Sequence, residues 1–243
     1  MDYSFLQCGE GALTVHLGDG IDPAINRRVT ALQGAIDSAG LRGITDLIPA
    51  YADLTVCYDC TVISAKALQR QLRRLLDSLS VAGQDRRRVF RLPVCYGGDY
   101  GPDLDFVCHH SGLSAQEVIE LHSAPDYLIY MLGFLPGFAY LGGLDPRLHT
   151  PRLDSPRTCI PAGSVGIGGA QTGVYPLASP GGWQLLGRTP VSVFDRQRQE
   201  PILYRAGDLV HFVPISPAEY EEIARAVAAG TYTVQVEEVP VCD

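Results

Sequence analysis

The chain of 243 residues has a hydrophobic fraction of 46%, a charged fraction of 19% and a formal net charge of −8, values typical of a soluble globular protein of one or two domains. The acidic charge disfavours nucleic-acid binding, because that binding depends on cationic side chains that neutralise phosphates. Seven scattered cysteines, no apolar run long enough to cross a bilayer and no signal-peptide pattern at the N-terminus predict a cytoplasmic protein with reduced thiols.

The first part of the chain alternates strand-like and helix-like patterns. A helix is expected after Asp22, which can cap it, with Pro23 at its first position. Leucines at helical spacing between Leu68 and Leu79 predict a second, amphipathic helix. We expect strands over 12–17, 44–49, 53–58 and 89–96, and helices over 22–38 and 64–79. This βαββαβ order predicts a small α+β domain over residues 1–96.

A Gly/Pro turn cluster over 97–102 is the expected boundary, and residues 97–243 form the second predicted domain. Ser114 and Glu117 have the spacing of a capping box, which marks the start of a helix. We expect helices over 104–110, 115–122 and 217–229, and strands over 127–133, 191–194, 202–205, 209–213 and 232–238. Short strands separated by turns predict a barrel or sandwich, so the fold class of the whole chain is predicted as α+β.

The segment from Met131 to Arg188 is the expected functional region. Gly and Pro recur every few residues there, interleaved with aromatic and polar side chains, and ordered loops of this kind usually carry binding residues. Prolines pin the stretch LHTPRLDSPR and would orient its side chains. The candidate catalytic residues are His149, Arg152 and Arg157. Arginine can grip a carboxylate or phosphate with two hydrogen bonds, although pairing with Asp145 or Asp154 is an open alternative.

Residues later in the same segment are the candidates for binding a substrate. Their side chains are amides, a hydroxyl and two aromatics with polar tips, which suit the recognition of a small polar molecule. They are Gln171, Thr172, Tyr175, Trp183 and Gln184.

Four other motifs favour structural interpretations. Cys57 and Cys60 lack a second ligand pair, so packing cysteines are favoured over a zinc site, and no metal site is predicted. Neighbouring residues of a helix point in different directions, which spoils joint ligation by Cys108, His109 and His110. The glycines of AGSVGIGG, namely Gly163, Gly166, Gly168 and Gly169, predict a strand–turn–strand with close backbone approach rather than a phosphate loop. Ser164 lacks the following helix that a nucleophile elbow requires.

The strings GFLPGFAYLGGL, PAGSVGIGGAQTGVYPLASPGGWQLLGRT and AGDLVHFVP resemble the KipI-like family, also called allophanate hydrolase subunit 1 or the carboxyltransferase C/D domain family. Within it the likeness is nearest to the branch found in bacterial ATP-dependent 5-oxoprolinases, and it runs from about Val89 to Pro214. The resemblance implies a small α+β domain followed by a cyclophilin-like β-barrel. It also implies a heteromeric complex with two partners, a second cyclophilin-like protein (the C type of 5-oxoprolinase component) and a third component (the A type).

The activity implied by the resemblance is the opening of 5-oxo-L-proline to L-glutamate with hydrolysis of ATP to ADP and phosphate. ATP, with Mg²⁺, would bind on partner subunits or between subunits, and the chain alone would be inactive. Arg152 and Arg157 would hold anionic groups, His149 would transfer a proton, and the polar residues from Gln171 to Gln184 would orient the amide.

Two other functions are compatible with the same family. One is inhibition of a sensor histidine kinase by protein contact, as described for KipI proteins. The other is a carboxyltransferase or allophanate-type role in urea utilisation. This chain has no biotinyl Met-Lys motif, so biotin would have to arrive on another protein.

Overall fold

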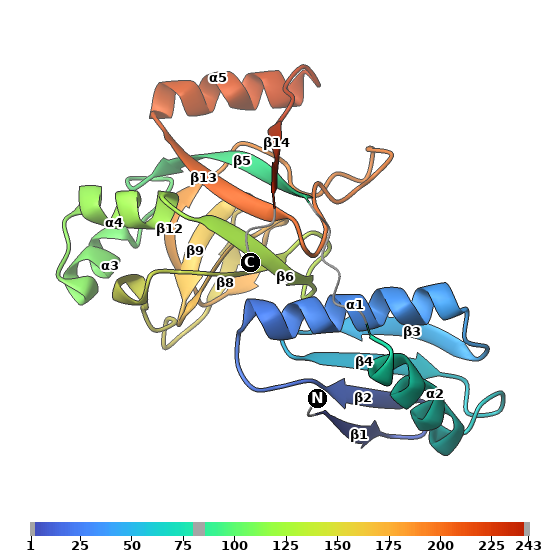
Figure 1. The fold of residues 1–243 in the computed structure, drawn as a ribbon. Helices are drawn as coiled ribbons and strands as arrows, with labels where there is room; N and C mark the ends of the chain where they lie inside the picture. The colour runs from blue at the N-terminus through green and yellow to red at the C-terminus, as the bar shows by residue number, and fades with distance from the viewer. Residues whose placement is uncertain (1–2, 80–85, 241–243) are drawn as a thin grey trace. The chain divides into compact units, whose positions relative to one another are not determined.

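The computed structural model describes residues 3–79 and 86–240, which form two compact units (Figure 1). Of the described residues, 3–79 belong to the first unit and 86–240 to the second. This division precedes the boundary predicted after Tyr96. The reason is β5 (Arg86–Tyr96), whose hydrogen-bonded neighbours all belong to the second unit. A strand pattern alone does not reveal which sheet a strand joins.

The N-terminal unit is a four-stranded antiparallel sheet with two helices. Its elements are β1 (Ser4–Cys8), β2 (Ala12–His16), α1 (Pro23–Ala39), β3 (Ile44–Pro49), β4 (Asp53–Tyr58) and α2 (Ala65–Asp77). The strand order is β1-β2-β4-β3. The chain order is therefore ββαββα and not the predicted βαββαβ. The edge strand β1 was not predicted, because its side chains are mostly exposed and show no alternation of apolar and polar residues.

The two helices of this unit begin where the sequence predicts. The carboxylate of Asp22 accepts hydrogen bonds from the backbone N–H groups of Ala24 and Ile25, and Ser64 caps α2 in the same way. Such caps satisfy N–H groups that have no partner within a helix. The buried leucines of α2 and alternate residues of β2 and β4 form one apolar core, which includes Leu13, Val15, Val29, Leu32, Leu54, Val56, Leu68 and Leu72.

The second unit is built on a closed β-barrel, as the resemblance implies. Its remaining strands are β6 (Asp126–Leu132), β7 (Ala139–Gly142), β8 (Arg157–Ile160), β9 (Ser164–Gly168), β10 (Gln171–Val174), β11 (Ser179–Gly181), β12 (Gln184–Arg188), β13 (Leu209–Ile215) and β14 (Gln235–Pro240). The barrel order is β12-β9-β10-β7-β6-β13-β5, and pairing of β5 with β12 closes it. Strands β8 and β11 form a separate two-stranded sheet. A closed barrel leaves its strands without free edges.

Helices α3 (Leu104–Ser111) and α4 (Ala115–Ser123) lie side by side at one end of the barrel (Figure 1). The predicted capping box of Ser114 and Glu117 starts α4. Buried Val107 and Val118 from these helices join the core formed by the barrel strands. The packing of α3 against β12 and of α4 against β13 therefore covers apolar surface at this end of the barrel.

A buried histidine links this helical cover to the barrel interior. The ring of His122 is fully buried, with Nδ1 2.8 Å from the Tyr96 hydroxyl and Nε2 2.8 Å from Thr172 Oγ1. Thr172 donates its own hydroxyl hydrogen to the Gly166 carbonyl, so Nε2–H of His122 donates to Thr172 and Nδ1 accepts from Tyr96. Burial lowers the pKa of His122 to about 3. The imidazole is therefore neutral at physiological pH and acts as a structural bridge.

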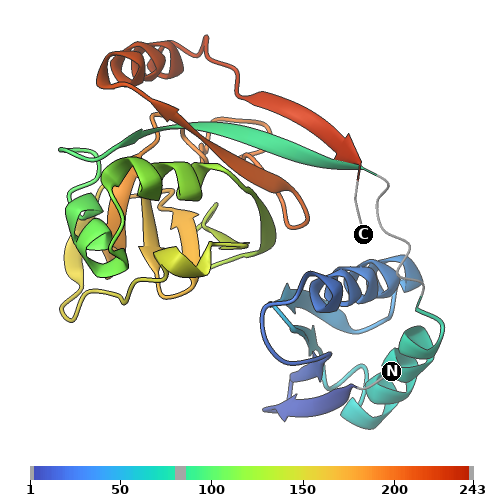
Figure 2. The same ribbon diagram turned by 60° about the vertical axis from the view of Figure 1, so that its left-hand side comes forward.

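The last part of the chain returns to the barrel through α5 (Pro217–Ala228) and β14. Figure 2 shows β14 beside the first half of β5, with which it pairs antiparallel over Arg86–Arg91. The strands predicted over 191–194 and 202–205 are reduced to one isolated bridge between Phe194 and Ile202. The predicted helix over 217–229 is confirmed, whereas the final strand begins later than predicted, at Gln235.

Candidate functional site

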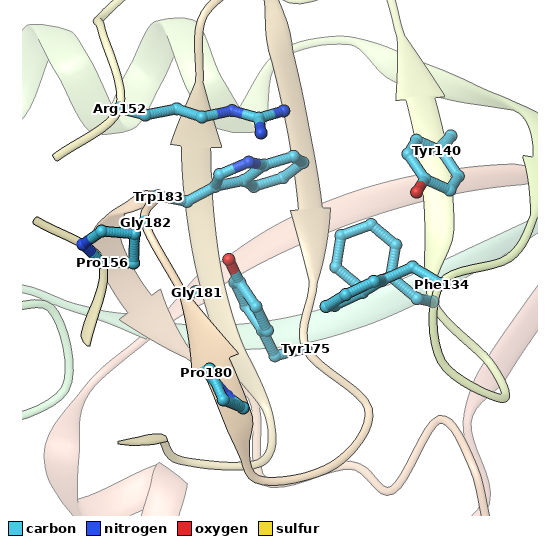
Figure 3. A pocket seen from close by; sticks show the side chains of 10 residues that line it. Phe134, Tyr140, Arg152, Pro156, Tyr175, Pro180, Gly181, Gly182 and Trp183 are labelled. Carbon is cyan, nitrogen blue, oxygen red and sulfur yellow. The ribbon is translucent and has the colours of Figure 1, made fainter. Parts of the chain in front are cut away.

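A cavity of about 300 Å³ opens on the second unit, within the segment that the sequence singles out (Figure 3). Three stretches of chain meet around it: the loop before β7, the loop between the short 3-10 helix η1 (Pro146–Leu148) and β8, and the region from β10 to β12. Its lining residues are Phe134, Phe138, Tyr140, Arg152, Pro156, Tyr175, Pro180, Gly181, Gly182 and Trp183. The wall is aromatic with very few polar groups, which is the usual composition of a small-molecule site.

The aromatic wall is a packed cluster and not a set of loose rings. Phe138 lies at its centre, with ring centroids 5.5 Å from both Tyr175 and Trp183 and 5.2 Å from Tyr140, all in edge-to-face geometry. Trp183 and Tyr175 are almost fully buried apart from the surface they give to the cavity. Edge-to-face rings hold one another in position, so this wall is preformed.

Glycines on the neighbouring strands make room for the indole of Trp183. A Cβ atom on Gly168 would lie 2.3 Å from Trp183 Nε1, and one on Gly173 would lie 3.2 Å from the same ring. At the turn between β9 and β10, Gly169 has φ 66°, a conformation that glycine adopts without strain. The predicted strand–turn–strand with close backbone approach is confirmed. Ser164 is fully buried in β9, which excludes the nucleophile-elbow arrangement for this serine.

Phe134 forms the outer edge of the cavity in a strained conformation. Its φ of 63° is the one positive φ at a non-glycine residue in the described part of the chain, and 64% of its surface is exposed. The ring makes an edge-to-face contact with Phe138 at 5.5 Å. Phe134 also lines a second, apolar hollow of about 290 Å³ beside Leu135 and Ile202. Strain combined with exposure of a large apolar ring is typical of a functional position.

Arg152 supplies the positive charge of the cavity. Its guanidinium carbon lies 5.8 Å from the centroid of the Trp183 ring, and Figure 3 shows the two side chains alongside each other. Arg88, Arg91, Arg147 and Arg157 pair closely with carboxylates, whereas no ion pair of Arg152 is found in the described part of the chain. A cation held against an aromatic face and open to the cavity can receive an anionic group of a ligand.

Arg157 and His149 lie outside the cavity. Arg157 donates to Asp103 at 2.6 Å and to the Trp183 carbonyl at 3.4 Å, while the other oxygen of Asp103 accepts from the Leu185 N–H at 2.7 Å. The guanidinium of Arg157 therefore holds the start of β12 in place. Its partner is neither Asp145 nor Asp154, the two carboxylates considered from the sequence. His149 is exposed at the end of η1 and does not line the cavity.

The predicted polar substrate contacts are only partly brought together. Tyr175 and Trp183 line the cavity, and burial raises the pKa of Tyr175 although the nearby Arg152 and Arg157 oppose this rise. Thr172 is fully buried in the His122 network. Gln184 is 2% exposed and donates its side-chain N–H to the Pro151 carbonyl, and Gln171 lies at the start of β10 outside the lining.

Phe134, Phe138 and Tyr140 line the cavity but are not among the predicted site residues. The signal that could have revealed them is the motif GFLPGFAY, in which glycines and a proline surround large aromatic residues. Turns of this kind place bulky rings next to one another without a regular strand or helix between them.

The sequence pattern described as "Carboxyltransferase domain, subdomain C and D" matches residues 3–204. The chain belongs to this family. Two similar curated proteins are both named as the B subunit of 5-oxoprolinase. The Bacillus subtilis protein is 42% identical over 228 residues, covering 90% of this chain and 95% of that protein. The Escherichia coli O157:H7 protein is 47% identical over 208 residues, covering 85% of this chain and 93% of that protein.

The urea amidolyase of Kluyveromyces lactis contains a region of similar fold. Its crystal structure superimposes with a TM-score of 0.81 over 98% of this chain, at 23% sequence identity. The chain spans only 16% of that larger enzyme. At this level of identity the likeness shows a shared fold and nothing about activity. Among the described residues, no helix has both the length and the apolar character needed to cross a membrane.

Proposed function

We propose that this chain is one component of an ATP-dependent 5-oxoprolinase, an assembly that opens 5-oxo-L-proline to L-glutamate with hydrolysis of ATP to ADP and phosphate. The observation that carries the proposal is the similarity to two proteins named as the B subunit of 5-oxoprolinase. The identities are 42% and 47%, and the matches cover at least 85% of this chain and 93% of each of those proteins. The cavity adds independent support from its chemistry.

The cavity suits the substrate of this reaction. 5-Oxoproline is a five-membered lactam that carries one carboxylate, so it needs an apolar wall for the ring and one cation for the acid. Trp183 and Phe138 offer the wall, and Arg152 offers the cation. A cavity of about 300 Å³ lies at the small end of ligand sites. In this role the chain binds the lactam, shields it from water and orients it.

The donor set does not fit ATP with Mg²⁺. A bound triphosphate requires several cations or a glycine-rich loop with a lysine. The cavity contains one guanidinium, and the sole lysine, Lys66, lies on α2 of the other unit. In the described ranges no group of three His, Cys, Asp or Glu side chains is placed to hold a metal ion. We therefore assign nucleotide binding to the partner subunits and derive no step through ATP on this chain.

The direct test is release of ADP and glutamate from 5-oxoproline by this chain mixed with its two proposed partners, one of the A type and one of the C type. We expect turnover in the full mixture and none when any component is omitted, including when this chain is tested alone. Activity that is undiminished without this chain contradicts the proposal. Stable binding to a sensor histidine kinase, with no turnover in any mixture, supports the regulatory alternative instead.

A further inference from the structure

Two hydrogen bonds tie the loop that carries Arg152 to segment 182–184, which contains Trp183 and the first residue of β12. The N–H of Leu153 donates to the Gly182 carbonyl at 2.7 Å, and the side-chain N–H of Gln184 donates to the Pro151 carbonyl at 3.0 Å. Residues 151 and 153 flank Arg152, and residues 182 and 184 flank Trp183. The cation and the indole are therefore fixed to each other from both sides by their immediate neighbours.

The two bonds differ in how they depend on the sequence. The bond from Leu153 joins two backbone groups and is independent of side-chain identity. The bond from Gln184 needs a side-chain donor of this length, and Gln184 is 2% exposed, so its amide cannot turn to water instead. One of the two hydrogen bonds that hold Arg152 near Trp183 therefore depends on the side chain of Gln184 alone.

The side chain of Arg152 has few other restraints. It is exposed, and within the described residues it forms none of the carboxylate pairs that hold Arg88, Arg91 and Arg157. Its stacking on Trp183 is a weak interaction at an exposed site. The position of the guanidinium consequently depends on where the loop backbone is anchored, and a displacement of about 1 Å is enough to weaken a two-bond contact with a carboxylate.

We propose that Gln184 is a positioning residue that anchors Arg152 over Trp183, and that through Arg152 it makes the cavity select cyclic amides that carry a carboxylate. This inference rests on the proposed function, because it takes a lactam acid as the ligand. Gln184 does not touch the ligand. The interaction that it controls is the one between the guanidinium and the ligand's carboxylate, and it leaves contacts with the ring unchanged.

The test uses the sole tryptophan, Trp183, as a fluorescent reporter in the full chain. Two ligands are titrated: 5-oxo-L-proline, and 2-pyrrolidinone, which has the same ring without the carboxylate. We expect Gln184→Met to weaken binding of 5-oxoproline about tenfold, the scale of one well-placed hydrogen bond to a charged group, and to leave 2-pyrrolidinone binding unchanged. In the assembled complex the same variant raises KM for 5-oxoproline with little change in kcat.

A double-variant cycle separates positioning from general damage. If Gln184 acts through Arg152, then Gln184→Met has no further effect on 5-oxoproline binding once Arg152→Ala is present. Gln184→Asn is a second variant, because it keeps the amide but is too short to reach Pro151. Gln116→Met, on the exposed face of α4, is the matched control and leaves binding of both ligands unchanged. Melting temperatures show that each variant is folded.

The outcomes distinguish this inference from the proposed function. Additive losses in the double variant, or equal weakening of both ligands, overturn the positioning role and leave the substrate site standing. Unaltered 5-oxoproline binding in both Gln184 variants also overturns it. Absence of any 5-oxoproline binding by the unaltered chain, alone and in the complex, overturns the substrate site and the inference together.

Discussion

Replacing Gly168 by alanine tests how closely the cavity wall is packed. The added methyl carbon would lie 2.3 Å from Nε1 and 2.4 Å from Cδ1 of Trp183, more than 1 Å inside van der Waals contact. The indole cannot simply move away, because Phe138 and Tyr175 pack edge-on against it. Overpacking of this kind destabilises a protein by about 1–3 kcal/mol. We expect the upper half of this range, since both contacts fall on a rigid ring.

For a unit of this size, that loss corresponds to a decrease in melting temperature of about 5–10 °C. The measurement is thermal unfolding followed by tryptophan fluorescence, which reports the barrel unit specifically because Trp183 is the only tryptophan. The emission maximum should also shift in the folded state, because the added methyl group changes the immediate surroundings of the indole. Gly133→Ala is the matched control in the same unit: its Cβ would lie 3.7 Å from the Tyr140 ring, an ordinary van der Waals contact, so we expect a nearly unchanged melting temperature. An unchanged melting temperature together with an unchanged emission maximum in Gly168→Ala would refute the packing argument.

Three further variants or conditions probe other parts of the molecule. The pKa of His122 is about 3 in the folded state and about 6.5 in an unfolded chain. Its contribution to stability is therefore complete above pH 6.5 and is lost as the pH falls toward 3, by up to about 1.4 kcal/mol per pH unit. Acid unfolding curves of the unaltered chain and of His122→Asn should differ by this slope, and parallel curves would contradict it. Asp103→Asn leaves Arg157 without its carboxylate and should lower the free energy of unfolding by about 1–3 kcal/mol in denaturant titrations, whereas a neutral result would show that the pair does not hold β12. In Phe134→Gly, glycine adopts the left-handed conformation that is strained for phenylalanine, so the melting temperature should rise slightly. Loss of the ring should weaken ligand binding at the cavity. Tighter binding in this variant would count against a binding role for the ring.

Local patterns in the sequence predicted the helices and the glycine-rich turn well, because short-range chemistry determines them. Asp22 and the pair Ser114 and Glu117 cap helices as expected, since each contacts backbone groups within three residues. The glycines around Gly168 were expected to allow close approach, and they do. Which ring would occupy the space was not predictable, because Trp183 comes from the residues just before β12, and no local pattern reveals the register of that strand.

The pairings that place the candidate site are long-range, and these could not be predicted. Arg157 was expected in the site, but it pairs outside the cavity with Asp103, which is 54 residues away in the chain. Thr172 is turned into the barrel core by His122, 50 residues earlier. A polar residue in a Gly/Pro-rich segment can face a ligand, a backbone carbonyl or a buried partner, and composition does not distinguish these outcomes. Arg152 was placed correctly in the segment, yet its stacking on Trp183 depends on the same long-range folding.

Strand β5 has a consequence for the order in which the molecule assembles during synthesis. It is the first barrel strand to leave the ribosome, yet its partners β12, β13 and β14 all come from Gln184 onward. The N-terminal unit has its own core and all of its strands before this point, so it can fold while the barrel is still incomplete. The backbone groups of β5, in contrast, remain unpaired until the last quarter of the chain has been made. Its N-terminal half carries three consecutive arginines, Arg86, Arg87 and Arg88, and such charges keep a waiting strand from pairing with the wrong neighbour.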